Sequence, residues 1–125
     1  FNPIAALRTA VAADAAPDAI DALFAHIWAH GQAGDSVDAL APVLAATHLS
    51  PGDVEAPAVK ARLRANTDAA IAAGVFGVPT LRIGDALFWG EDAHDFALAA
   101  LADPGLLDTP QMQRLARLPV GASRA

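Results

Sequence analysis

Residues 74–80, with the sequence Gly-Val-Phe-Gly-Val-Pro-Thr, form the first of two segments whose residue types suit ligand binding. Pro79 stands immediately before a strand-like run, a position that proline tolerates. If the peptide bond between Val78 and Pro79 is cis, the N–H and C=O of Val78 face outward, where an extended ligand can pair with them. The alternative is an ordinary trans turn, since only about 5–6% of X-Pro bonds are cis. The residues alone leave both conformations open.

Residues 88–92, with the sequence Phe-Trp-Gly-Glu-Asp, form the second segment. Here a strand runs into Gly90 and then into the start of a helix, where backbone N–H groups can hold a carboxylate. Glu91 or Asp92 can hold an ammonium group, so the segment suits the α-carboxylate and α-amino group of an amino acid. The alternative is that the two acids only cap the helix and complement its dipole.

The histidines do not form a convincing metal site. His26 and His30 are four residues apart on an expected helix, but at 100° per residue they lie well away from the centre of its apolar stripe. No acidic residue follows His26 as it does in a zinc protease motif. His48 and His94 stand alone. We therefore expect the histidines at the solvent boundary and predict no metal site.

No nucleophile with a neighbouring base can be identified either. Each serine is better explained as a cap or tail residue than as a nucleophile: Ser36, Ser50 and Ser123. There is no cysteine, which removes disulfides, thiolate zinc sites and dithiol chemistry from these 125 residues. We predict no catalytic residue within the chain. Three aromatic side chains are candidates for lining an apolar substrate pocket: Trp28, Phe76 and Trp89.

Composition narrows the possible partners. The net charge of −6 argues against nucleic acid and anionic membranes, which need clustered lysine and arginine. No segment resembles the run of 18 or more apolar residues that spans a bilayer. The absence of cysteine is compatible with a reducing compartment. We therefore expect no nucleic acid and no membrane as a partner.

Helix signals fill the first 74 residues. The first expected helix starts at Asn2-Pro3 and ends near Asp14, and the second starts at Pro17 and stops at Gly31. A third helix is expected to start at Gly34-Asp35-Ser36. A short capped turn at Ser50-Pro51-Gly52-Asp53 and a longer helix from Pro57 to Gly74 follow. The second helix carries an apolar stripe of Ile20, Leu23, Phe24, Ile27 and Trp28. The third helix directs Leu40, Val43 and Leu44 inward.

Strand signals appear only after residue 79. Residues 80–83 and 86–89 are short strand-like runs joined by Gly84-Asp85, which predicts a hairpin. A helix is expected from Glu91 and a last short one from Thr109-Pro110. A two-stranded hairpin is marginal by itself and exposes its edge. Because the chain also begins without Met, we expect a fragment whose other strands lie upstream of Phe1.

Residues 74–80, followed eight residues later by residues 88–92, resemble the C-terminal signature of 2-hydroxychromene-2-carboxylate isomerases. This family is related to kappa-class glutathione transferases and to DsbA-type oxidoreductases. The opening Phe-Asn-Pro, the Leu-Arg pair at residues 7–8 and the ending at residues 118–122 are also similar to the family. The Gly-Val-Pro part is shared widely among thioredoxin-like folds, whereas Phe-Trp-Gly-acid-Asp is far more specific.

The resemblance implies an α/β thioredoxin-like fold with an all-helical insertion. Residues 1–73 would be the helical insertion domain, and residues 74–125 the C-terminal hairpin and helix of the thioredoxin-like domain. The fragment would then be mostly α with one β-hairpin, and a missing N-terminal βαβ unit would supply the other strands.

The resemblance also implies a glutathione site. Val78 beside cis-Pro79 would pair through its backbone with the cysteinyl part of glutathione. Glu91 and Asp92 would hold the γ-glutamyl end, and Trp89 belongs to the same set. Two departures stand out: Glu91 is acidic where relatives often carry a neutral polar residue, and Ala93 replaces a common arginine.

The implied function is a glutathione-dependent isomerase of aromatic compound degradation. A serine near the N-terminus of such enzymes stabilises the glutathione thiolate, which adds to an aromatic substrate, permits bond rotation and leaves. No residue here matches that serine, so we expect the chain alone to be inactive. The family further implies a small aromatic substrate, a homodimer and a cytoplasmic location.

Two alternatives remain open. A DsbA-like thiol-disulfide oxidoreductase would need a Cys-x-x-Cys motif in the expected missing segment. A non-catalytic binding or structural module would need no such motif, and would not bind glutathione.

Overall fold

The computed structural model describes residues 2–118 and divides into two compact units, Phe1–Ala72 and Ala73–Ala125. The division lies one residue before the boundary predicted from the sequence. The interpretation of the first unit as an insertion within a thioredoxin-like domain stays a prediction.

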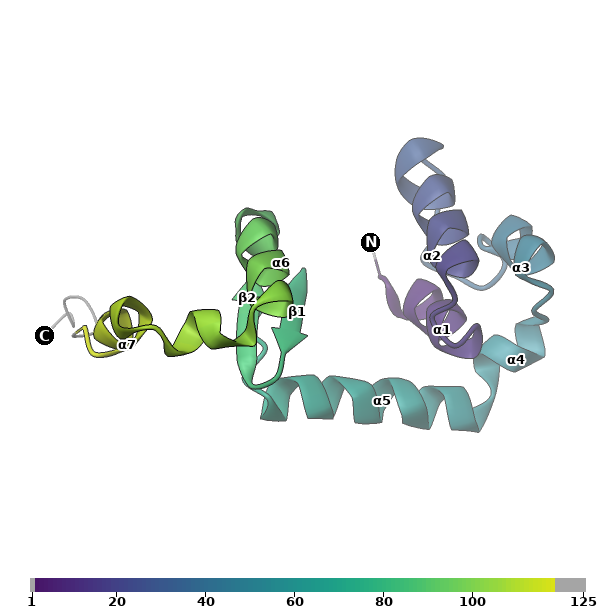
Figure 1. Ribbon diagram of the computed structural model, residues 1–125. Coiled ribbons are helices and arrows are strands. Elements are labelled where there is room, and N and C mark those ends of the chain that lie inside the picture. The colour runs from purple at the N-terminus through teal and green to yellow at the C-terminus, as the bar shows by residue number, and fades with distance from the viewer. Residues whose placement is uncertain (1, 119–125) are drawn as a thin grey trace, which may run out of the picture. The chain divides into compact units, whose positions relative to one another are not determined.

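The described part of the first unit is helical, as the sequence predicts. Its elements are α1 (Ile4–Ala12), α2 (Pro17–Phe24), a π-helical turn (Ala25–Ala29), α3 (Ala41–Thr47), α4 (Pro51–Glu55) and α5 (Pro57–Ala72) (Figure 1).

Local polar contacts explain where these helices begin. The side chain of Asn2 accepts a hydrogen bond from the Ile4 N–H at 3.1 Å, which confirms its role at the start of α1. At α4, Ser50 and Asp53 form a reciprocal capping box: the Ser50 hydroxyl accepts from the Asp53 N–H, and the Asp53 carboxylate accepts from the Ser50 N–H at 2.8 Å. The capped turn predicted at this position is therefore confirmed.

The prediction for the start of the third helix is wrong. The helix α3 begins at Ala41, and the Ser36 hydroxyl caps only a local turn by accepting from the Ala39 N–H at 3.2 Å. Pro42 supplies the physical reason, because proline fits in the first turn of a helix but removes a hydrogen bond and clashes in its interior. The inward direction of Leu40, Val43 and Leu44 is nevertheless confirmed, since all three are buried.

The second helix also departs from its prediction. Its α-helical part ends at Phe24, and a π-helical turn leads to Gly31, whose φ of 63° ends the helix where expected. His26 in this turn is buried, not at the solvent boundary, and its Nε2 donates to the carbonyl oxygen of Ala33 at 2.9 Å. Local spacing alone cannot show this contact, because it depends on the chain turning back after the helix.

Small side chains build the core of the first unit. Its buried cluster comprises Ala5, Leu23, Leu40 and Val43, with further alanines packed around it. Of the predicted stripe on the second helix, Leu23 is buried. Phe24 and Trp28 are mostly exposed, although their ring centroids lie 4.6 Å apart. Alanine-rich helices thus approach closely while the large aromatic side chains stay outside.

The second unit contains the predicted hairpin. Strands β1 (Thr80–Ile83) and β2 (Ala86–Trp89) are antiparallel, with Thr80 opposite Trp89 and Ile83 opposite Ala86. Gly84 has a φ of 60°, which supplies the left-handed conformation that the tight turn requires. The hairpin prediction is confirmed in position and length.

Helical segments follow the hairpin. They are a 3₁₀ turn (Glu91–Ala93), α6 (His94–Ala102), a second 3₁₀ turn (Pro104–Asp108) and α7 (Pro110–Ala116). Helix α6 lies against the hairpin (Figure 1), where Phe88, Ala97 and Ala100 form the buried cluster. The Thr109 hydroxyl accepts from the Met112 N–H and caps α7, so this predicted start is confirmed. Most of the chain ending at residues 118–122 falls outside the described residues.

No helix within residues 2–118 has the length and apolarity needed to cross a bilayer. Within the same residues, no group of three or more histidine, cysteine, aspartate or glutamate side chains is placed to hold a metal ion.

Candidate functional site

The two ligand-binding segments predicted from the sequence meet at one end of the hairpin. The Gly90 N–H donates to the carbonyl oxygen of Pro79 at 2.9 Å, one step beyond the Thr80–Trp89 pair that ends the ladder. This hydrogen bond joins the turn before β1 to the turn after β2. Val78 comes directly before Pro79 and Glu91 directly after Gly90, so these two residues flank the hydrogen bond in their turns.

Val78 presents its backbone at this end. The Val78–Pro79 peptide bond is cis, which is one of the two conformations that the sequence leaves open. Val78 is 87% exposed, and within residues 2–118 neither its N–H nor its C=O makes a hydrogen bond. Both backbone groups are thus available to an extended ligand.

Two aromatic side chains, Phe76 and Trp89, pair at the same end of the hairpin. The rings of Phe76 and Trp89 lie 5.2 Å apart between centroids, and both side chains are more than half exposed. Gly77 permits the close approach of Trp89, because a Cβ at this position would lie 2.5 Å from the indole Nε1. Sequence reasoning missed this role of Gly77, since it depends on a contact across the hairpin.

A side-chain contact also fixes the turn before β1. The Thr80 hydroxyl donates to the carbonyl oxygen of Gly77 at 2.6 Å. Ser and Thr hydroxyls commonly hydrogen-bond to nearby backbone groups in turns. Thr80 therefore positions the loop, although the sequence analysis gave it no separate role.

Glu91 and Asp92 occupy the 3₁₀ turn that leads into α6. Both are exposed, and within the described residues neither carboxylate makes a hydrogen bond or an ion pair. The alternative predicted for these acids, a side-chain cap on the helix, is not formed here. Their charge still complements the positive end of the helical segment. Ala93, which stands where relatives of the resembled family place an arginine, packs against the Phe88–Ala97–Ala100 cluster.

The five predicted site residues thus lie at the same end of the hairpin. Pro79 accepts the hydrogen bond from Gly90, Val78 precedes it, Glu91 and Asp92 follow Gly90, and Trp89 packs against Gly77 and Phe76. Of the three predicted pocket aromatics, Phe76 and Trp89 pair with each other, whereas Trp28 belongs to the other unit and pairs with Phe24.

A comparison with known protein families identifies the family of the chain. Residues 2–102 match the family model of the DSBA-like thioredoxin domain, which covers most of the chain. The chain belongs to this family. Neither a comparison with curated proteins nor one with solved structures gave a match.

The family match fits the observed fold of this DSBA-like chain. A mostly helical chain with one β-hairpin agrees with the predicted fold class, which is confirmed as a DsbA-like thioredoxin fold. The match includes both segments of the candidate site and ends with α6 at residue 102. The family includes both oxidoreductases and isomerases, so the match does not distinguish between these two activities.

Proposed function

We propose that this DSBA-like chain carries a glutathione-binding half-site of an isomerase resembling the 2-hydroxychromene-2-carboxylate isomerases, which act in aromatic compound degradation. The observation that supports the proposal is the Gly90–Pro79 hydrogen bond of 2.9 Å, which joins the turn that contains Val78 to the turn that contains Glu91 and Asp92. Each turn would supply one contact to the ligand. One contact is peptide-like and the other is acidic.

The peptide-like contact is the backbone of Val78. Its exposed N–H and C=O can pair with the backbone of an extended peptide, as an additional strand would. In glutathione this part of the ligand is the cysteinyl residue. Such pairing would set the thiol at the end of the hairpin, beside the exposed rings of Phe76 and Trp89.

The acidic contact is the pair Glu91 and Asp92. An ammonium group is the natural partner of carboxylates that have no partner among the described residues, and the backbone N–H groups of the same turn suit a carboxylate. The γ-glutamyl end of glutathione carries both an ammonium and a carboxylate. Glu91 is expected to repel that carboxylate in part, so the binding should be weaker than with a neutral residue.

The proposed chemistry uses the thiol of glutathione as a temporary nucleophile. The thiolate adds to the aromatic-derived substrate and forms a carbon–sulfur bond, rotation follows about a bond that has become single, and the thiolate leaves as the double bond returns. Atoms and electrons balance without any oxidant. The serine that would stabilise the thiolate would come from outside residues 2–118, because the serines of that range, Ser36 and Ser50, cap a turn and a helix of the first unit.

A titration of the isotopically labelled chain with glutathione tests the half-site. We expect amide shifts at Val78, Gly90 and Asp92, and weaker binding in Asp92→Asn. The matched control is Asp95→Asn, which removes the same charge from an exposed residue on α6. No shift at these amides, or equal weakening by both variants, would reject the proposal.

A thiol-disulfide oxidoreductase is the second candidate, because the family match agrees with it equally well. With no cysteine in the chain, the required cysteine pair would have to come from outside these residues. The dipeptide Cys-Gly, which lacks the γ-glutamyl group, distinguishes the two. Equal affinity for Cys-Gly and glutathione would favour a general peptide contact at Val78 and hence the oxidoreductase.

A further inference from the structure

A second candidate site lies entirely within the helical unit. An open groove of about 570 Å³ separates α1 from α5. Its cationic side chains are Arg8 of α1 and Lys60 and Arg64 of α5, and Ile4 and Leu63 add apolar surface. One acidic side chain, Asp68 of α5, also lines the groove, so its three cations outnumber its acids. None of these residues belongs to the hairpin site, and the inference below does not depend on the function proposed for it.

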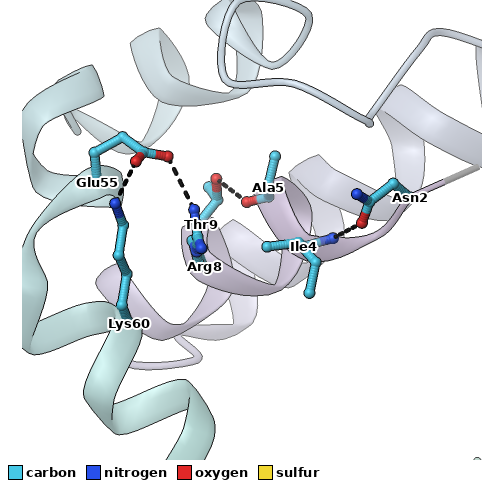
Figure 2. A network of polar contacts seen from close by, with 7 residues as sticks. All are labelled: Asn2, Ile4, Ala5, Arg8, Thr9, Glu55 and Lys60. Carbon is cyan, nitrogen blue, oxygen red and sulfur yellow. Dashed lines mark hydrogen bonds and ion pairs between the residues drawn. The ribbon is translucent and has the colours of Figure 1, made fainter.

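Glu55 gathers two of the cations at one end of the groove. As Figure 2 shows, its two carboxylate oxygens contact Lys60 Nζ at 2.6 Å and Arg8 Nη1 at 3.1 Å. The hydrogen bond from Lys60, together with the nearby charges of Lys60 and Arg8, holds the pKa of Glu55 below its ordinary value. One negative charge thus keeps two positive charges together, which leaves a local excess of positive charge.

Both cations retain hydrogen-bond donors for another anion. Within the described residues, Arg8 and Lys60 each use one N–H group on Glu55. A guanidinium has five N–H donors and an ammonium has three. A carboxylate entering the groove can therefore bind both side chains without displacing Glu55.

Arg64 is the most adaptable of the three cations. Its side chain is 85% exposed, and its contact with Asp68 is long, at 3.9 Å. Exposed pairs of this kind contribute little to stability. Arg64 can thus turn toward an anion in the groove at little cost.

The groove also offers apolar surface beside these charges. Ile4 is 41% exposed, and Leu63 is half-buried on the facing helix. α5 buries none of its side chains, so its apolar surface stays open to a ligand. A ligand with an anionic head and a short hydrocarbon body would match both kinds of surface.

The surrounding charge favours a small anion over a polymer. Residues 1–72 carry eight acidic side chains against four basic ones. The remaining cation of this unit, Arg62, pairs with Asp14 and does not line the groove. A nucleic acid or anionic bilayer would meet this acidic surface, whereas a single carboxylate would meet only the groove.

We propose that the groove between α1 and α5 binds small amphipathic carboxylates, with the head on Arg8, Lys60 and Arg64 and the body on Ile4 and Leu63. The site is separate from the candidate glutathione site. It would give the helical unit a ligand of its own.

Titration of the labelled chain with hexanoate, acetate and 1-hexanol tests the proposal. We expect hexanoate to shift the amides of Leu63, Arg64 and Thr67, and to bind at least about fivefold more tightly than acetate, because its body leaves water. Hexanol should bind more weakly than hexanoate, and added salt should weaken only the two anions.

Two matched variants test the role of charge. Arg64→Gln should weaken hexanoate binding about threefold, the size of an exposed charge contact. Arg62→Gln removes the same charge from the same helix outside the groove, and should leave binding unchanged. Circular dichroism verifies that both variants stay folded. Equal effects of the two variants, equal binding of hexanoate and hexanol, or no shift at the groove amides would each overturn the proposal.

Discussion

The starts of α4 and of the segment leading into α6 differ in how they use an acidic side chain. At α4, Asp53 closes a capping box with Ser50, so one oxygen of its carboxylate, Oδ2, accepts hydrogen bonds that hold the helix start. After β2, Gly90 occupies the position before the turn and has no side chain to reciprocate. Glu91 and Asp92 consequently make no side-chain hydrogen bond within the described residues. The same type of sequence signal stabilises a helix in one unit and leaves carboxylates available in the other.

The largest expected effect comes from substitution of a glycine in the hairpin unit, with a glycine of α4 in the helical unit as its control. Gly77→Ala would place a Cβ 2.5 Å from Trp89 Nε1, so the indole or the loop must move. We expect the free energy of unfolding of the hairpin unit to fall by about 1–3 kcal/mol. Urea unfolding followed through the amide signals of residues 80–89 measures this change.

Gly52→Ala is the control for that substitution. Its Cβ would meet the Ser50 Oγ at 3.6 Å, an ordinary contact, and alanine favours a helix over glycine by about 0.5–1 kcal/mol. The helical unit should therefore become slightly more stable. Destabilisation by both substitutions would show that the indole contact at Gly77 is not the cause.

Removal of the capping hydroxyl should have the next largest effect. Ser50→Ala removes the hydroxyl that accepts from the Asp53 N–H and donates to the Asp53 carboxylate, and leaves that N–H only the Ser50 carbonyl oxygen, so the stability of the helical unit should fall by about 1 kcal/mol. Chemical denaturation read from amides of residues 51–55 and 40–44 provides the measurement. An unchanged midpoint would mean that the capping box adds nothing to stability.

The capping box should also make the helical unit sensitive to acid. Hydrogen bonds from the Ser50 side chain and backbone hold the pKa of Asp53 below its ordinary 3.8. The folded-state pKa is the lower one, so the stabilisation is present above about pH 4 and is lost as the pH falls through the folded-state value. Asp53→Asn should remove this dependence, which acid titration of stability tests. A variant with the same acid profile would contradict the assignment.

The smallest expected effect is on the stability of the hairpin unit when Asp92 is neutralised. Asp92→Asn removes an exposed carboxylate that has no hydrogen bond in the described residues, so the free energy of unfolding should change by less than about 0.5 kcal/mol. Binding of glutathione should nevertheless weaken. A large loss of stability would mean that Asp92 stabilises the fold as Asp53 does, and would contradict the difference inferred between the two carboxylates.

Local sequence signals account for the parts of the fold that were predicted correctly. The capping box needs only Ser50 and Asp53 three residues apart, and the hairpin needs only two strand-like runs around Gly84. These contacts form between near neighbours, so spacing is sufficient to predict them.

Contacts between distant residues explain what the sequence did not predict. The burial of His26 depends on the Ala33 carbonyl after the chain has turned back, and the role of Gly77 depends on Trp89 across the hairpin. The candidate site was predictable only in part. Its residues were identified from two local motifs, while their meeting at the Gly90–Pro79 hydrogen bond follows from the hairpin register.

The Gly90–Pro79 hydrogen bond has a further consequence for motion. It extends the pairing of the hairpin by one contact into two loops that would otherwise fluctuate independently. The Gly90 amide should therefore exchange with solvent more slowly than its loop position suggests. Because the two loops are tied together, a ligand that contacts both would order them as one body and lose conformational entropy once.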